Sequence, residues 1–237
     1  SDMVNILESD LFIYNGGGME PWVHNLIENN EINVLDASEG IELIKTELHE
    51  HEEEQEHKHG EYDPHVWLSP TNAIKQVENI RDKLIEIDPE NEEYYTNNAK
   101  EYIEKLEGLD EKIKMEINNE KCKKSEVVIT HATLAYFCRD YGLEQIALTG
   151  INPQAEISVK QLTEIMEHIE GKNVTVIFTE EQINPQTAQV IAQELGIQTM
   201  TLNTIHGISD EDKKAGKNYI TLMEDNISKL KIALECE

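Results

Sequence analysis

Histidine is the side chain in this 237-residue sequence whose placement most clearly indicates chemistry, and it occurs nine times. One of these, His65, lies in the stretch DPHVWLSP, residues 63–70. The Asp-Pro pair favours a turn, and Ser69 followed by Pro70 is typical of the start of a helix, so His65 should lie on a short, stiff connection. A ring that its neighbours hold in place loses little entropy when it binds a metal. We therefore predict that His65 is a metal ligand.

Two further histidines follow predicted strands in the second half of the chain. His131 comes directly after the predicted strand 127–130, and His206 comes shortly after the predicted strand 199–202. In parallel sheets that helices cover on both faces, ligands bind beyond the carboxyl ends of the strands. A single histidine in a loop is more often structural, but three at equivalent positions on separate elements predict one metal site. We assign that site to His65, His131 and His206.

The remaining candidates divide into three groups. His24 and His168 lie inside predicted helices, so we expect them at the surface and outside the site. Glu180 and Glu181 directly follow the predicted strand 174–179 and are candidates to support the metal ligands or to fill a vacant coordination position. The third group lies in the segment 47–61, which is dense in glutamate and histidine. Its candidate metal-collecting ligands are His49, His51, His57 and His59.

The segment 47–61 has no apolar periodicity and cannot bury itself, so we predict a loop outside the core. A plain acidic insertion is one interpretation of this loop. Because its histidines alternate with carboxylates, it also offers several weak, exchanging metal sites at high local concentration. We therefore favour a loop that collects metal ions.

The totals exclude some partners. A formal net charge of -28 argues against nucleic acid or an anionic membrane surface, since both require clustered Lys and Arg. No apolar stretch has the length of a transmembrane helix.

The three cysteines are too few for a disulfide framework or a CxxC metal site. One pair could be bridged in an extracytoplasmic protein, and the sequence does not say which. They are Cys122, Cys138 and Cys236.

The elements that must position these residues belong to an α/β fold of two lobes. In the first half we predict strands over 11–14 and 32–35, and helices over 3–8, 21–29, 41–44 and 70–87. An uninterrupted helical pattern over 90–118 would span roughly 40 Å, which exceeds the needs of one small lobe. In the second half, strands over 127–130, 146–148, 174–179 and 199–202 alternate with helices over 134–141, 159–170 and 185–195, and one last helix covers 213–234.

These patterns give the predicted domain organisation. An N-terminal lobe covers 1–89 and contains the loop 47–61, a linking helix covers 90–118, and a C-terminal lobe covers 119–237. Each lobe should hold a mostly parallel sheet flanked by helices.

Several motifs resemble one known family. The stretch at 63–70 after a His-rich acidic loop, NGGGMEPW at 15–22, THA at 130–132 and NPQAEIS at 152–158 are similar to those of the metal-binding lipoproteins and periplasmic proteins that supply zinc or manganese to ABC importers. The resemblance covers essentially the whole chain. It implies two α/β lobes joined by a rigid helix, with the metal site in the cleft between the lobes. It also implies metal ligands at His65, His131 and the position of His206, where many members have a carboxylate. A fourth ligand, a first-lobe histidine, is expected upstream of Ser1, together with the first strand and helix of that lobe.

The resemblance also sets our functional expectation, which is a monomeric extracytoplasmic receptor. It would be lipid-anchored at the cell surface, as in Gram-positive bacteria, or periplasmic, and it would deliver its metal to a membrane permease. A site built from imidazoles favours Zn²⁺ over Mn²⁺. A manganese receptor or adhesin of the same fold is the first alternative. A zinc hydrolase is the second, against which stands the lack of an HExxH motif. We therefore expect no enzymatic activity.

Overall fold

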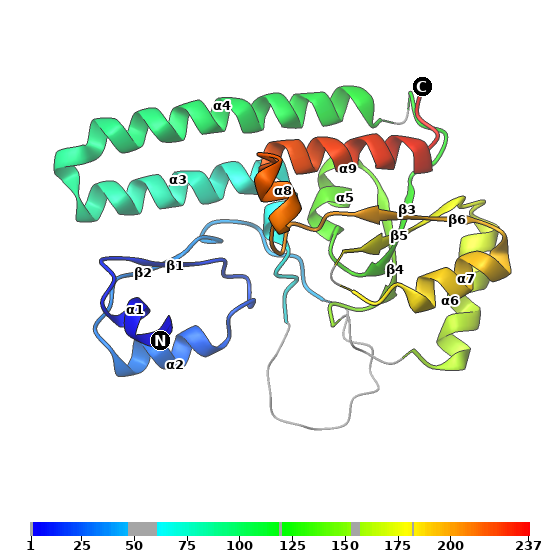
Figure 1. Cartoon of the computed structure of the whole chain (residues 1–237), viewed down its shortest axis with the longest axis horizontal. Coiled ribbons are helices and arrows are strands. Elements are labelled where there is room, and N and C mark those ends of the chain that lie inside the picture. Colours follow the sequence, from blue (N-terminus) through cyan, green and yellow to red (C-terminus); the bar gives the residue numbers. More distant parts are fainter. Residues whose placement is uncertain (1, 47–60, 119, 153–156, 182) are drawn as a thin grey trace. The chain divides into compact units, whose positions relative to one another are not determined.

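The computed structural model describes residues 2–46, 61–118, 120–152, 157–181 and 183–237. It divides the chain into two compact units, Ser1–Glu107 and Gly108–Glu237. Mostly parallel sheets flanked by helices, together with one long helix, confirm the predicted fold class, and Figure 1 labels the elements. Within the described ranges, no helix combines the length and the apolar character that a membrane crossing requires.

The first unit is built around a two-stranded parallel sheet. Strand β1 (Phe12–Tyr14) pairs with β2 (Val34–Asp36), and helix α2 (Trp22–Asn29) forms the crossover between them. A short helix α1 (Asp2–Leu7) precedes the sheet. After β2 come the 3₁₀ turn η1 (Val66–Leu68) and helix α3 (Pro70–Ile87).

The predicted helix over 41–44 is wrong. Residues 41–44 have no helical structure, and the backbone there pairs instead with the segment that leads to His65. The amide of Thr46 donates to the carbonyl of Glu61, and the amide of Asp63 donates to that of Ile44. These two bonds satisfy backbone groups that a single helical turn would have left without partners.

Helix α3 begins as the sequence predicts. Ser69 is its N-cap, with a side-chain oxygen that accepts from the amide of Asn72 at 3.2 Å, and Pro70 occupies the first turn. The helix ends before Pro89, and the turn η2 (Pro89–Asn91) leads into the long helix α4 (Glu92–Glu116). The division between the two units falls within α4, at Gly108.

The second unit contains a four-stranded, all-parallel sheet in the order β4-β3-β5-β6. The central strands β3 (Glu126–His131) and β5 (Val176–Glu180) are almost completely buried, whereas the edge strands are more exposed. The edge strands are β4 (Glu144–Thr149) and β6 (Gln198–Leu202). This arrangement confirms the predicted alternation of strands and helices.

Helices cover both faces of this sheet (Figure 1). On one face, α6 (Val159–Gly171) and α7 (Gln186–Leu195) pack their apolar side chains against strand residues such as Val128 and Ile177. Helices α5 (Ala135–Tyr141) and α9 (Tyr219–Ala233) lie on the other face. The part of α4 that belongs to this unit lies beside α9, through the ion pairs Lys112–Glu224 and Lys231–Glu116.

The predicted single helix over 213–234 is wrong, because the structure contains two helices there. Helix α8 (Asp210–Lys214) ends before Gly216, whose φ of 72° is in the left-handed region. Helix α9 then starts anew at Asn218, which forms a capping box with Thr221.

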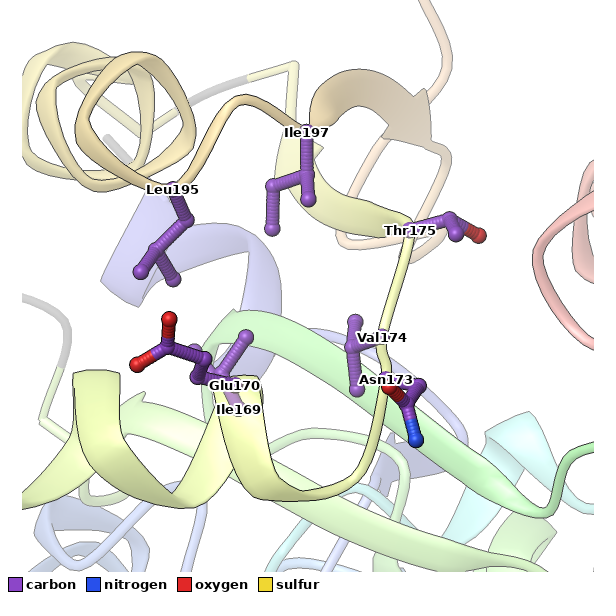
Figure 2. A pocket seen from close by; sticks show the side chains of 7 residues that line it. All are labelled: Ile169, Glu170, Asn173, Val174, Thr175, Leu195 and Ile197. Atoms are coloured by element: carbon purple, nitrogen blue, oxygen red, sulfur yellow. The ribbon is translucent and has the colours of Figure 1, made fainter.

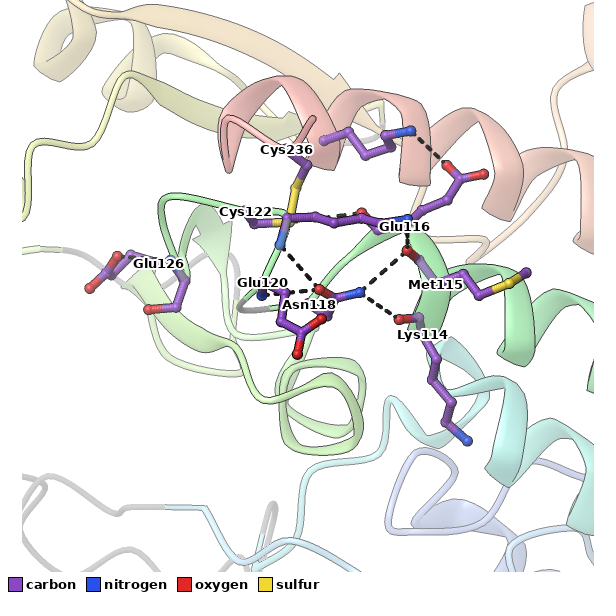
Figure 3. The surroundings of a disulfide bond; sticks show 11 residues. Lys114, Met115, Glu116, Asn118, Glu120, Cys122, Glu126 and Cys236 are labelled. Atoms are coloured by element: carbon purple, nitrogen blue, oxygen red, sulfur yellow. Dashed lines mark hydrogen bonds and ion pairs between the residues drawn. A yellow bond between two sulfur atoms is a disulfide. The ribbon is translucent and has the colours of Figure 1, made fainter.

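A disulfide joins Cys122 to Cys236, the pairing that the sequence left open (Figure 3). It connects the segment before β3 to the residues after α9, and backbone hydrogen bonds from Lys123 to Leu234 and from Glu237 to Lys121 run alongside it. The third cysteine, Cys138, is buried in α5, and burial raises the pKa of its thiol. The covalent link therefore ties the end of the chain to the start of the strand that carries His131.

Candidate metal centre

His65 lies in the first unit on the turn that precedes α3. One carboxylate oxygen of Asp63 accepts from the backbone amide of His65 at 2.8 Å and lies 2.7 Å from its ring Nδ1. Both side chains are buried. An ionised carboxylate can only accept, so Nδ1 carries the proton, and the lone pair of a neutral ring is then on Nε2. Asp63 therefore fixes both the orientation of the ring and its tautomer.

The glycine-rich turn after β1 supports this connection. The side-chain amide of Asn15 donates to the carbonyl of Pro64 at 2.9 Å. The carboxylate of Glu20 accepts from the amides of Asn15 and Gly16, which closes the turn and places an acidic group where a phosphate cradle would need a basic one. Gly16 has a φ of 80°, and a Cβ there would meet the carboxylate of Asp36 at 1.7 Å. The turn therefore requires glycine for close packing.

In the second unit, the register of the sheet places Glu180 beside His131. The neighbouring strands β3 and β5 pair Ile129 with Phe178, so their last residues meet at the carboxyl edge. There the carboxylate of Glu180 lies 2.5 Å from Nδ1 of His131 and accepts from the hydroxyl of Thr130 at 2.5 Å. Burial favours protonation of Glu180, but the hydrogen bonds from His131 and Thr130 outweigh it and lower the pKa of this carboxyl. Glu180 thus holds His131 as an ionised acceptor.

His206 reaches the same edge from the loop after β6. Strand β6 pairs with β5 so that Leu202 lies opposite Glu180, and the chain continues past the edge into residues 203–206. The rings of His131 and His206 have centroids 6.0 Å apart and planes inclined by 31°. Nδ1 of His206 lies 2.9 Å from the hydroxyl of Thr204, and the side chain is exposed. Three adjacent strands therefore bring two imidazoles and one carboxylate to a single edge.

The other predicted residues fall outside this edge or support it indirectly. His24 and His168 are exposed, as predicted, and their rings lie near the carboxylates of Glu28 and Glu144. Glu181 is exposed, and its carboxylate accepts from the side chain of Asn203 at 3.2 Å. The candidate collecting residues lie outside the described part of the chain, and they are His49, His51, His57 and His59.

The partners of His65 and His206 were not among the predicted site residues. The aspartate two positions before His65 was noted only as part of a turn, although an Asp at that spacing commonly accepts from the backbone two residues on. Thr204 stands at the same spacing before His206, and its hydroxyl could have been found by the same rule.

A pocket of about 300 Å³ lies elsewhere in the second unit (Figure 2). Its apolar walls include Ile169, Val174, Leu195 and Ile197. Val174 precedes β5 and Ile197 precedes β6, so the pocket lies toward the amino edge of the sheet, opposite the edge that carries His131. It therefore takes no part in the metal centre.

Comparisons with known proteins find relatives over nearly the whole chain. The chain is 38% identical over 240 residues to the high-affinity zinc uptake system protein ZnuA of Bacillus subtilis, covering 98% of this chain and 74% of that protein. It is 36% identical over 235 residues to the zinc-binding lipoprotein AdcA of Streptococcus pneumoniae, covering 97% of this chain but only 46% of AdcA.

Two solved structures are also similar. The Zn(II)-bound ZnuA-like domain of S. pneumoniae AdcA superposes with a TM-score of 0.80 at 35% identity, covering 98% of this chain and 82% of that one. The laminin-binding protein Lbp of Streptococcus pyogenes gives a TM-score of 0.82 at 28% identity, covering 98% of this chain and 85% of that one. The family model described as zinc-uptake complex component A, periplasmic, matches residues 1–233, and the chain belongs to that family.

Proposed function

We propose that this chain is an extracytoplasmic receptor that captures Zn²⁺ and delivers it to the membrane permease of an ABC importer. The observation that carries the proposal is the pairing of His131 with His206 at the carboxyl edge of the second sheet, in a chain of the zinc-uptake family. Two imidazoles held on separate elements at such an edge suit a borderline divalent metal.

The proposed ligands are Nε2 of His65, His131 and His206. In support, Nδ1 of each ring lies against an oxygen atom, of Asp63, Glu180 or Thr204. An outer hydrogen bond on one ring nitrogen orients the other toward a metal and raises its basicity. Three imidazoles occupy three positions of a tetrahedron, and water or a further protein ligand would complete it.

The chemistry of this ligand set favours zinc. Carboxylate and water oxygens suit Mn²⁺, whereas a set made only of imidazoles suits Zn²⁺ and its neighbours in the transition series. His206 contributes nitrogen where a carboxylate would contribute oxygen. We also retain the collecting role of the loop 47–61 as part of the proposal, with the ion passing from the loop to the histidines.

We assign the chain no catalytic role. A hydrolase would need a general base close to the metal-bound water, and the two carboxylates near this edge already have other partners. Glu180 holds His131, and Glu181 holds Asn203. The likeness to the laminin-binding protein Lbp makes cell adhesion a second candidate, which binding to laminin-coated surfaces would test.

The deciding experiment is a calorimetric titration of the metal-free chain with zinc and with manganese. We expect one tight zinc site that is weakened by orders of magnitude in His131→Ala and is unchanged in His168→Ala, the exposed control. Manganese should bind more weakly than zinc. Zinc binding that is weak in the unsubstituted chain and equal in all three proteins would contradict the proposed receptor.

A further inference from the structure

The loop that carries His206 has an unfavourable backbone conformation. Ile205 has a φ of 54°, which a β-branched residue rarely adopts because its side chain crowds the neighbouring carbonyl. The chain has no regular secondary structure between β6 and α8 at this point. Some other interaction must therefore hold the loop, because a strained segment persists only where its surroundings impose it.

That interaction is a pair of hydrogen bonds from α9. The side-chain oxygen of Asn226 accepts from the backbone amide of Asn203 at 2.9 Å, and its side-chain nitrogen donates to the carbonyl of Asn203 at 2.7 Å. Both residues are buried, at 4% and 6% exposure. One amide side chain thus satisfies both backbone groups of a residue that has just left the sheet, as a neighbouring strand would.

The side chain of Asn203 continues the network toward His206. Its oxygen accepts from the amide of Ile205 at 2.8 Å, so it holds the strained residue directly, and its nitrogen donates to Glu181. The contacts therefore run from α9 through Asn203 to Ile205, and His206 is the next residue. We call Asn226 and Asn203 the asparagine clamp.

Asn226 is a polar side chain on the buried face of α9. The other buried side chains of α9 are apolar, namely Leu222, Met223, Ile227, Leu230 and Ala233. A buried amide among them costs free energy unless it is hydrogen-bonded, and an apolar side chain would pack this face as well. His131 and His65 each have a buried carboxylate that orients the ring, whereas His206 is exposed and has a hydroxyl. The orientation of the His206 ring therefore depends mainly on the conformation of its own backbone.

We propose that Asn226 is a positioning residue, which sets zinc affinity by fixing the backbone that presents His206. This inference rests on the proposed zinc-receptor function. Residues that orient a metal ligand without contacting the metal typically contribute 10- to 100-fold to metal affinity. We therefore expect Asn226→Asp, which keeps the acceptor but sets an oxygen against the carbonyl of Asn203, to weaken zinc binding about tenfold or more.

A double-mutant cycle tests the inference in the full chain. Zinc affinity is measured by chelator competition for the unsubstituted chain, Asn226→Asp, His206→Ala and the double variant. If Asn226 acts through His206, the Asp substitution weakens zinc binding in the original chain but has almost no further effect once His206 is absent. An equal loss in both backgrounds would overturn the inference.

The visible spectrum of the Co²⁺-loaded protein and the unfolding midpoint together distinguish a positioning role from a general loss of stability. Leu230→Ala removes a buried apolar side chain one turn away on α9 and is the matched control, and Asn226→Ala is the second clamp variant. We expect the visible spectrum of the Co²⁺-loaded protein, which reports coordination geometry, to change in both clamp variants and to stay unchanged in Leu230→Ala. The positioning role would be overturned if zinc affinity fell in proportion to the unfolding midpoint in every variant, Leu230→Ala included.

The same series distinguishes this inference from the function on which it rests. Absence of tight zinc binding in the unsubstituted chain would remove the receptor function. Tight binding that is lost in His131→Ala yet unaffected in both clamp variants would leave the receptor function standing and overturn only the role of Asn226.

Discussion

An oxygen atom lies against Nδ1 of each predicted metal ligand, and for His65 that atom belongs to a buried carboxylate. Because the same oxygen of Asp63 also accepts from the backbone amide of His65, it fixes the ring and the main chain together. Loss of the Asp63 carboxylate should therefore disturb both the ring and the backbone of His65.

At the residue scale, we predict that Asp63→Ala weakens zinc binding about 10- to 100-fold. Asp63→Asn should lose less, because its side-chain oxygen can still accept from both donors. Competition with a chelator measures the affinity. Asp82→Ala is the control, since Asp82 is exposed and pairs with its neighbour Arg81. Unchanged affinity in Asp63→Ala would show that the carboxylate does not orient a ligand.

At the element scale, the elements whose first or last residues carry clear start or stop signals were predicted well. The start of α3 was evident because Ser69 and Pro70 mark it. Short apolar runs predicted strand ends at 130 and 179, each one residue before the observed ends of β3 and β5. The break between α8 and α9 was missed because the apolar spacing after Tyr219 was extended backward across Gly216. Local spacing identifies an element, whereas its exact interruption depends on caps.

The same scale explains which parts of the site could be predicted. The convergence of His131 and His206 on one edge could be predicted because parallel strands carry their ends to one edge whatever the details of packing. The partners Glu180 and Asn226 could not be assigned to atoms from sequence. Their contacts join residues 49 and 23 positions apart, and they depend on strand register and on the face that α9 buries.

We also predict the cost of removing the cap of α3. Ser69→Ala deletes the acceptor for the amide of Asn72, and loss of an N-cap typically lowers the free energy of unfolding by about 1 kcal/mol. Urea denaturation of the metal-free chain measures this change. Thr71→Ala, at an exposed position in the first turn, is the control and should have little effect. Equal midpoints for the two variants would mean that the cap does not stabilise the helix.

At the scale of the whole molecule, the disulfide is a covalent constraint on the chain. It joins residues 114 positions apart, and closing so long a loop restricts the unfolded chain substantially. We predict that Cys122→Ser lowers the free energy of unfolding by about 2–5 kcal/mol. Reductant should lower the stability of the unsubstituted chain similarly and leave Cys122→Ser unaffected. A variant as stable as the oxidised chain would contradict this.

The position of that disulfide also determines how the second unit would respond to a protease. Residues 122–236 form one covalent ring, and His131, Glu180, His206 and Asn226 all lie within it. A single cleavage anywhere in the ring opens it without releasing a fragment, so both histidines stay on one molecule until a reductant separates the pieces. In a setting where peptidases are common and thiols are scarce, a nicked second unit would still hold both of its imidazoles.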